Sequence, residues 1–293
     1  MVLIRLGWLY ESLPTLSEQL WDWYNVLWKV TFSWNWDRFD LPPYNPNLWT
    51  IPVEFCNSLL LFITIAGLSR MKTYLRLASS IAISIYCLKC GHWAAFEFLM
   101  GMVMAEISLI QDSIPLLSSV TSRVLKYCLI GNLVFGIFIA GWPNAEADKT
   151  PGISALWFNT IEPYWGTGDG LYISFYWYSL AAVQIVAALQ QIKLLQNLFV
   201  TPLAQYLGDI SFAFYLVHGP IKEMVVPRGL PFLWSTVGGP DEAGMWGRMI
   251  VWCAALIVIG IPAVWAADLF WRVVDVKSVE LARSIETCCT RDD

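Results

Sequence analysis

The sequence predicts an all-α membrane protein, a polytopic bundle of about seven transmembrane helices. Of its 293 residues, 57% are hydrophobic and only 14% are charged, and the mean hydropathy is +0.54. Soluble domains carry about 25% charged residues, so this composition favours a bilayer as the solvent. The 17 Trp and 12 Tyr fit the same environment, because amphipathic rings collect at membrane interfaces.

Charge and cysteine content exclude two other classes of protein. The formal net charge of -5 comes without a basic tract, so we expect no nucleic-acid partner. The seven cysteines are scattered over the whole chain, which is unlike a disulfide-stabilised scaffold. The sequence also offers no pattern of metal ligands, and no bound metal or cofactor is predicted.

The first 50 residues contain no stretch that could cross a membrane. Residues 18–39 combine many tryptophans with interspersed charges, which is typical of a helix lying in the interface. We therefore predict that residues 1–52 form a Trp-rich interfacial segment outside the cytosol.

Seven apolar stretches then follow, each long enough for a transmembrane helix or nearly so. Pro52 suits the first position of the first helix, because proline has no N–H to leave unpaired there. The predicted spans are residues 53–69, 75–90, 92–110, 124–142, 171–190, 203–221 and 249–270. They define a membrane domain of residues 53–270, followed by a tail of residues 271–293.

The basic residues predict the orientation of these spans. They are Arg70, Lys72 and Arg76 in one loop, Arg123 and Lys126 in another, Lys193 in a third, and Arg272, Lys277, Arg283 and Arg291 in the tail. With seven spans all four groups fall on one side, which the positive-inside rule makes cytosolic. The N-terminus then lies outside the cytosol and the C-terminal tail inside.

A polar stripe interrupts the sixth apolar stretch. In residues 207–220 (LGDISFAFYLVHGP), the side chains of Ser211, Tyr215 and His218 fall within about 60° of one another on a helix. Polar groups inside a membrane usually face a cavity or another helix. We expect Gly219 and Pro220 to bend or end this helix.

Three stretches carry a resemblance to a known family. Residues 47–55 (NLWTIPVEF), residues 98–106 (FLMGMVMAE) and residues 207–220 occur in this order. They resemble the recurring motifs of the acyltransferase 3 family of multi-pass membrane acyltransferases, in their fungal wording. The likeness extends over most of the chain, but the helix that carries the family's catalytic histidine has no counterpart here. The resemblance therefore implies that the chain enters the family pattern after its first few spans.

The resemblance also implies an activity. Members of the family transfer an acyl group, such as acetyl, from acyl-CoA to a hydroxyl group. Acyl-CoA is thus the expected donor substrate, and a small molecule, such as a secondary metabolite, or a glycan is the expected acceptor. Membrane lipid is the remaining expected partner. Which membrane holds the chain is not predicted.

Several residues are candidates for the site. The predicted substrate cavity is lined by Trp49, Glu54, Asn57, Ser211, Tyr215 and His218. His218 and Glu54 are the candidate catalytic groups. Each has a plainer alternative, because His218 could sit at the interface and Glu54 could stabilise the start of its helix. Trp49 could likewise be an interface anchor.

The cluster of Arg70, Lys72 and Arg76 is a candidate for binding the phosphates of acyl-CoA, by its position only. Two other features have structural interpretations. We expect Glu97, near the middle of a span, to be protonated or to hydrogen-bond a neighbouring helix. Gly101 and Ala105, four residues apart, predict close helix packing.

Three other functions remain open at this point. Seven spans with the N-terminus outside also match a seven-helix receptor or a transporter. The chain could instead be a catalytically inactive acyltransferase-like protein or a purely structural membrane partner.

Overall fold

The computed structural model describes residues 13–31, 42, 44–113, 123–166 and 170–290, and these residues form helices and no strand. Four helical segments are long and apolar enough to cross a membrane: Pro46–Leu68, Trp93–Gln111, Leu171–Gln191 and Met245–Cys289. A shorter apolar helical stretch covers Tyr127–Ala140. The protein is therefore helical with several candidate membrane spans.

The chain divides into two compact units, which are described separately. The first contains residues 39–51 and 200–293 together with the N-terminal segment, and the second consists chiefly of residues 52–199. Helices of the first unit are α1 (Leu16–Thr31), η1 (Pro46–Trp49), α9 (Pro202–Asp209), α10 (Ser211–Ser235), α11 (Met245–Phe270), the π-helix η4 (Trp271–Asp275) and α12 (Val276–Cys289).

The second unit contains most of α2 (Thr50–Leu68), which begins two residues before the division. Its other helices are α3 (Thr73–Lys89), α4 (Trp93–Ser113), α5 (Arg123–Ala140), η2 (Ala147–Lys149), α6 (Ile153–Phe158), η3 (Glu162–Tyr164), α7 (Leu171–Gln191) and α8 (Lys193–Phe199).

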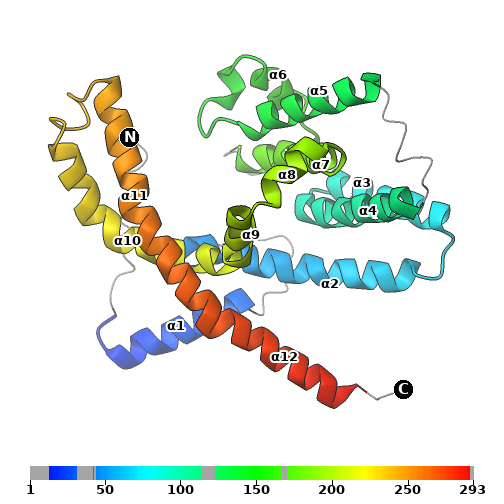
Figure 1. Cartoon of the computed structure of the whole chain (residues 1–293), viewed down its shortest axis with the longest axis horizontal. Helices are drawn as coiled ribbons and strands as arrows, with labels where there is room; N and C mark the ends of the chain where they lie inside the picture. Colours follow the sequence, from blue (N-terminus) through cyan, green and yellow to red (C-terminus); the bar gives the residue numbers. More distant parts are fainter. Residues whose placement is uncertain (1–12, 32–41, 43, 114–122, 167–169, 291–293) are drawn as a thin grey trace. The chain divides into compact units, whose positions relative to one another are not determined.

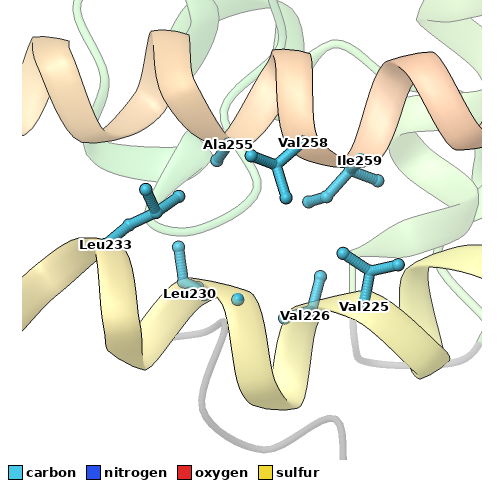
Figure 2. Close-up of a pocket in the computed structure, with 8 residues that line it drawn as sticks. Val225, Val226, Leu230, Leu233, Ala255, Val258 and Ile259 are labelled. Carbon is cyan, nitrogen blue, oxygen red and sulfur yellow. The ribbon is translucent and has the colours of Figure 1, made fainter.

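In the first unit, α10 and α11 run side by side along most of their lengths (Figure 1). Figure 2 shows Val226 and Leu230 of α10 pointing toward Ala255 and Val258 of α11. Aliphatic side chains that interdigitate in this way are the usual basis of helix packing. The base of the pair is closed by the buried residues Ile210, Ala213 and Ala267.

The sixth predicted span needs two corrections. The helix breaks at Ile210, whose backbone bond to Tyr206 ends α9, and α10 begins at Ser211. Beyond that point α10 continues through Pro220 to Ser235, so the prediction that Gly219 and Pro220 end it is wrong. The alternative, that they bend it, stays a prediction. Proline keeps a helical φ, and a helix packed along its length can tolerate the lost backbone bond.

In the second unit, α3 packs on α4, α4 on α7, and α7 on α5. Gly136 of α5 makes a close approach to α7, where a Cβ atom would lie 3.0 Å from Ile185 Cγ1. Gly101 behaves differently, because a Cβ built there meets no heavy atom within 4 Å among the described residues, and Ala105 is exposed. The close packing predicted for Gly101 and Ala105 is therefore wrong for the described residues.

The segment between α5 and α7 folds into an aromatic cap, which we define as Trp142, Trp157, Thr160, Tyr164, Trp165 and Trp177. Trp142 stacks on Trp177 with ring centroids 6.3 Å apart. The Tyr164 side chain is fully buried, and its hydroxyl donates to the Leu88 carbonyl at 2.9 Å. The cap thereby covers the last turn of α3, whose final carbonyls lack helical donors.

Other predictions fall partly outside the described residues. Helix α1 covers the first part of the predicted interfacial segment 18–39, whereas residues 32–39 lie outside the described ranges. The side chains of Arg123 and Lys126 and the whole of Arg291 lie outside them too. The division into residues 1–52, 53–270 and 271–293 remains a prediction.

Candidate functional site

The candidate site lies in the first unit, where a short helical strap contacts α10. We use "strap" for residues 45–50, which contain η1 and the first residue of α2. Asn45 starts the strap, because its side-chain Oδ1 accepts a hydrogen bond from the Asn47 N–H at 3.2 Å. An Asn cap followed by Pro46 is a strong start signal for a helix.

The same Asn45 side chain bonds to α10. Its Nδ2 donates to the Leu216 carbonyl at 3.3 Å, and the residue is only 8% exposed. In an unbroken helix that carbonyl would accept from the N–H of residue 220, which is a proline. The Asn45 amide thus supplies the donor that Pro220 lacks, and this helps to explain why α10 continues through the proline.

A second hydrogen bond joins the strap to the polar stripe of α10. The Thr50 hydroxyl donates to Tyr215 Oη at 2.8 Å. Thr50 belongs to the NLWTIPVEF stretch and Tyr215 to the LGDISFAFYLVHGP stretch, which are separated by more than 150 residues of sequence. Two of the three motifs are therefore parts of one contact.

Gly219 allows this close approach. A Cβ atom at this position would lie 2.5 Å from Asn47 Nδ2 and 2.8 Å from Asn45 Oδ1, well inside van der Waals contact. The Asn45 amide could move away only by losing its bonds to Asn47 and Leu216. The strap and α10 therefore fit only because residue 219 has no side chain.

His218 lies one residue before this glycine and is half-buried. Its Nδ1 is 2.8 Å from the Tyr215 carbonyl and 3.1 Å from the Phe214 carbonyl, and its ring stacks on Phe214. Because carbonyl oxygens only accept, we assign the proton of the neutral ring to Nδ1. Nε2 then carries the lone pair and can accept a proton.

Two other residues of the predicted site, Ser211 and Trp49, also lie in this unit. Ser211 is the first residue of α10 and is exposed, so it shares the helix with Tyr215 and His218 but not their burial. Trp49 is half-buried at the end of η1. The structure thus brings Thr50 and Tyr215 together. His218 lies three residues after Tyr215 on α10, and Trp49 directly precedes Thr50 in the strap.

Glu54 and Asn57 lie on α2 in the second unit. Because α2 begins at Thr50, not Pro52, Glu54 is its fifth residue and lies outside the first turn. The predicted role of Glu54 at the helix start is therefore wrong. Glu54 is exposed, whereas Asn57 is buried and its Nδ2 donates to the Val53 carbonyl at 2.7 Å.

The basic cluster is split by an ion pair. Arg70 and Lys72 are exposed in the loop between α2 and α3. Arg76 instead forms hydrogen bonds from Nε and Nη2 to the Glu106 carboxylate on α4, with the Nε bond at 2.8 Å. Glu106 is the acidic residue that ends the FLMGMVMAE stretch, so this third motif helps to hold α3 on α4.

Glu97 lies on α4 and makes a side-chain hydrogen bond with Ser179 of α7. Ser179 is fully buried, and its hydroxyl oxygen lies 2.7 Å from the Phe175 carbonyl oxygen. The prediction that Glu97 bonds a neighbouring helix is therefore confirmed.

Sequence analysis missed Asn45 and Gly219 as parts of the site. The signals were present, because Asn-Pro predicts a helix start and a proline inside a helix predicts an orphaned carbonyl four residues earlier. What the sequence could not supply is that the two signals belong to one contact.

Comparisons with known proteins agree with the family resemblance. A family model described as an acyltransferase domain matches residues 3–270. The chain is 27% identical over 256 residues to the O-acetyltransferase PaAT-1 of Phomopsis amygdali, covering 82% of this chain and 48% of that protein. It is 26% identical over 246 residues to the acyltransferase clz18 of Cochliobolus lunatus, covering 78% and 51%.

The chain thus spans about half the length of these curated relatives. No solved structure matches it. Because the family model covers nearly the whole sequence, and two of the three motifs on which the resemblance rests meet in a hydrogen-bonded contact, the chain belongs to the acyltransferase 3 family.

Proposed function

We propose that the chain is a membrane-bound O-acyltransferase that moves a short acyl group from acyl-CoA to a hydroxyl of a small molecule or a glycan. Family membership and a relative named as an O-acetyltransferase support this proposal. The observation that carries it is the contact between Thr50 and Tyr215 beside His218, because it gathers motif residues with catalytic chemistry. The fungal wording of the motifs favours a secondary metabolite as the acceptor.

The reaction needs two kinds of group. A base removes the acceptor's hydroxyl proton while its oxygen attacks the thioester carbonyl carbon. A hydrogen-bond donor stabilises the oxyanion that forms on this carbonyl. When the tetrahedral intermediate collapses, the C–O bond remains, the C–S bond breaks and CoA leaves with the proton as a thiol.

The site residues can fill both roles. His218 Nε2 holds the lone pair that a base needs, since Nδ1 faces backbone carbonyls. Tyr215 Oη accepts from Thr50, so its own hydrogen is free to donate to an oxyanion. In this proposal Thr50 is a positioning residue, and Trp49 and Ser211 belong to the wall of the substrate cavity in the first unit.

The membrane arrangement belongs to the same proposal. Seven spans, an N-terminus outside the cytosol and a cytosolic tail place the loop between α2 and α3 in the cytosol, where acyl-CoA is found. Arg70 and Lys72 are exposed in this loop and can meet the phosphates of CoA. Arg76 contributes less, because Glu106 already occupies its guanidinium.

The test uses the two histidines of the chain as a matched pair. The full chain is reconstituted in liposomes with radiolabelled acetyl-CoA and a panel of alcohols and monosaccharides, and both labelled ester and released CoA thiol are measured. We expect transfer by the parent chain and by His92→Gln, and a loss of at least about 100-fold for His218→Gln.

Each other result is informative. No ester and no thiol from the parent chain, when it is folded by size-exclusion chromatography, contradicts the enzymatic function and supports an inactive relative. Equal activity of His92→Gln and His218→Gln would contradict the proposed role of His218 as the base, but not the acyltransferase function itself. For the donor site, we expect Arg70→Gln with Lys72→Gln to raise KM for acetyl-CoA with kcat unchanged, whereas Lys193→Gln leaves both unchanged.

A further inference from the structure

Helix α1 has two sharply different faces. Leu16, Leu20, Trp23 and Leu27 recur at helical spacing and are 75%, 56%, 48% and 44% exposed, respectively. No residue of α1 is buried. Large apolar side chains that gather on one exposed face usually mark an interaction surface.

The side of α1 that borders this apolar face at Gln19 and extends to Asp22 is tied down by a polar clasp, which we define as Gln19, Asp22 and Tyr44. Gln19 Nε2 donates to Tyr44 Oη at 2.6 Å, and Tyr44 Oη donates to the Asp22 carboxylate at 2.7 Å. Desolvation and the Asp22 carboxylate raise the pKa of Tyr44, so the phenol keeps its proton at neutral pH. The clasp thereby fixes the rotation of α1 about its axis.

The position of the clasp along the chain indicates what covers the apolar face. Tyr44 lies two residues before Pro46, where the candidate membrane span Pro46–Leu68 begins. The polar face of α1 is therefore held at a membrane boundary. A helix at that level with an aliphatic and Trp face suits the region between headgroups and acyl chains.

We propose that the Leu16, Leu20, Trp23 and Leu27 face of α1 is a lipid-binding surface at the membrane interface, and that the Tyr44 clasp sets which face meets the lipid. The helix carries Glu18, Asp22 and Lys29, so it has no excess of positive charge. Its ligand is thus the acyl-chain boundary of a zwitterionic bilayer, and anionic headgroups are not required. This proposal does not depend on the catalytic role of His218.

The clasp also borders the strap, because Asn45 follows Tyr44 directly. One residue holds the polar face of α1, and the next supplies the donor for the Leu216 carbonyl of α10. The residue that anchors α1 and the residue that anchors the strap on α10 are therefore neighbours in the chain.

Photo-crosslinking in the full chain tests the proposal. A benzoylphenylalanine is placed at Leu20 on the apolar face or at exposed Lys29 on the polar face, and each chain is reconstituted in phosphatidylcholine vesicles with radiolabelled acyl chains. We expect several-fold more lipid label at position 20 than at position 29. Adding Tyr44→Phe should lower the label at position 20 and raise it at position 29.

Three results would overturn it. Crosslinks from position 20 to a second copy or to another segment of the chain would identify a protein contact as the occupant. Equal lipid labelling at both positions would show that the helix has no preferred face. An unchanged pattern in Tyr44→Phe, in a chain that remains folded by size-exclusion chromatography, would remove the role of the clasp.

Discussion

The strap contact of the first unit and the aromatic cap of the second solve the same problem in different ways. In each, a backbone carbonyl of a helix lacks its usual donor. Pro220 leaves the Leu216 carbonyl without one, and the end of α3 leaves the Leu88 carbonyl without a helical one. The strap meets this need with an amide, Asn45, whereas at Leu88 the phenol of Tyr164 adds a second bond to the one from the Gly91 N–H.

The two regions differ in whether their side chains keep unpaired hydrogen-bonding groups. In the cap, two of the indole N–H groups are bonded internally, since Trp165 Nε1 donates to the Thr160 carbonyl and Trp177 Nε1 to the Thr160 hydroxyl. In the strap contact, the hydrogen of Tyr215 and the Nε2 of His218 have no acceptor or donor among the described residues. The cap is therefore a stabilising element, whereas the strap contact retains groups for a ligand.

The largest expected effect comes from filling the space at Gly219. The Gly219→Ala change places a methyl group against Asn45 and Asn47, and overpacking of this kind costs about 1–3 kcal/mol. We expect a fall of several degrees in the thermal unfolding midpoint in detergent, together with lost acetyl transfer. Gly101→Ala is the matched control, because a Cβ atom built at residue 101 meets no described heavy atom within 4 Å. Alanine also favours a helix over glycine by roughly 1 kcal/mol, so this variant should not lose stability. An equal fall in both variants would mean that the strap does not pack on α10.

The next effect tests whether Asn45 replaces the missing donor of Pro220. Asn45→Ala leaves the Leu216 carbonyl unpaired and removes the cap of η1, at a cost of about 2 kcal/mol. In a Pro220→Ala background residue 220 has its own N–H, so the same change should cost only the cap. A double-mutant cycle on unfolding midpoints measures the difference. Additive effects would contradict the shared carbonyl.

In the cap, Tyr164→Phe should have a smaller effect than Asn45→Ala. The change removes the bond to the Leu88 carbonyl, but that carbonyl also accepts from the Gly91 N–H at 3.2 Å. We expect a cost of about 1 kcal/mol in stability and no change in acetyl transfer. Tyr172→Phe is the control in the same unit, because no hydrogen bond of its hydroxyl is recorded among the described residues. A loss of activity in Tyr164→Phe at unchanged stability would place the cap in the substrate site.

The same comparison shows what the sequence could predict. Each of the seven apolar stretches contains helix, because their length and hydrophobicity leave the backbone no other way to pair in a bilayer. The exact number of spans remains a prediction. The Tyr215 and His218 stripe was also readable, since helical periodicity alone places both on one face.

The sequence-based predictions that were wrong concern features that depend on contacts between residues far apart in the sequence. Pro52 predicts a helix start locally, but the Asn45 cap begins η1 earlier, and η1 leads directly into α2. Pro220 predicts a helix end, but Asn45 and the packing of α11 keep α10 intact. The aromatic cap could not be predicted either, because it also depends on a contact between distant residues. No local sequence pattern indicates that the Tyr164 hydroxyl bonds to the Leu88 carbonyl.

The smallest and sharpest test compares two threonines, one in each region. Thr50→Val and Thr160→Val keep the side-chain shape and remove one hydroxyl each, at about 0.5–1.5 kcal/mol per lost bond. In the cap, Thr160→Val leaves the Trp177 N–H without its acceptor in a buried site, so we expect the unfolding midpoint to fall with kcat unchanged. In the strap, Thr50→Val frees a half-buried phenol that can rebond to a ligand, so we expect kcat to fall with little change in the midpoint. If both variants changed stability and kcat by similar amounts, the distinction between a stabilising cap and a ligand-binding strap contact would be contradicted.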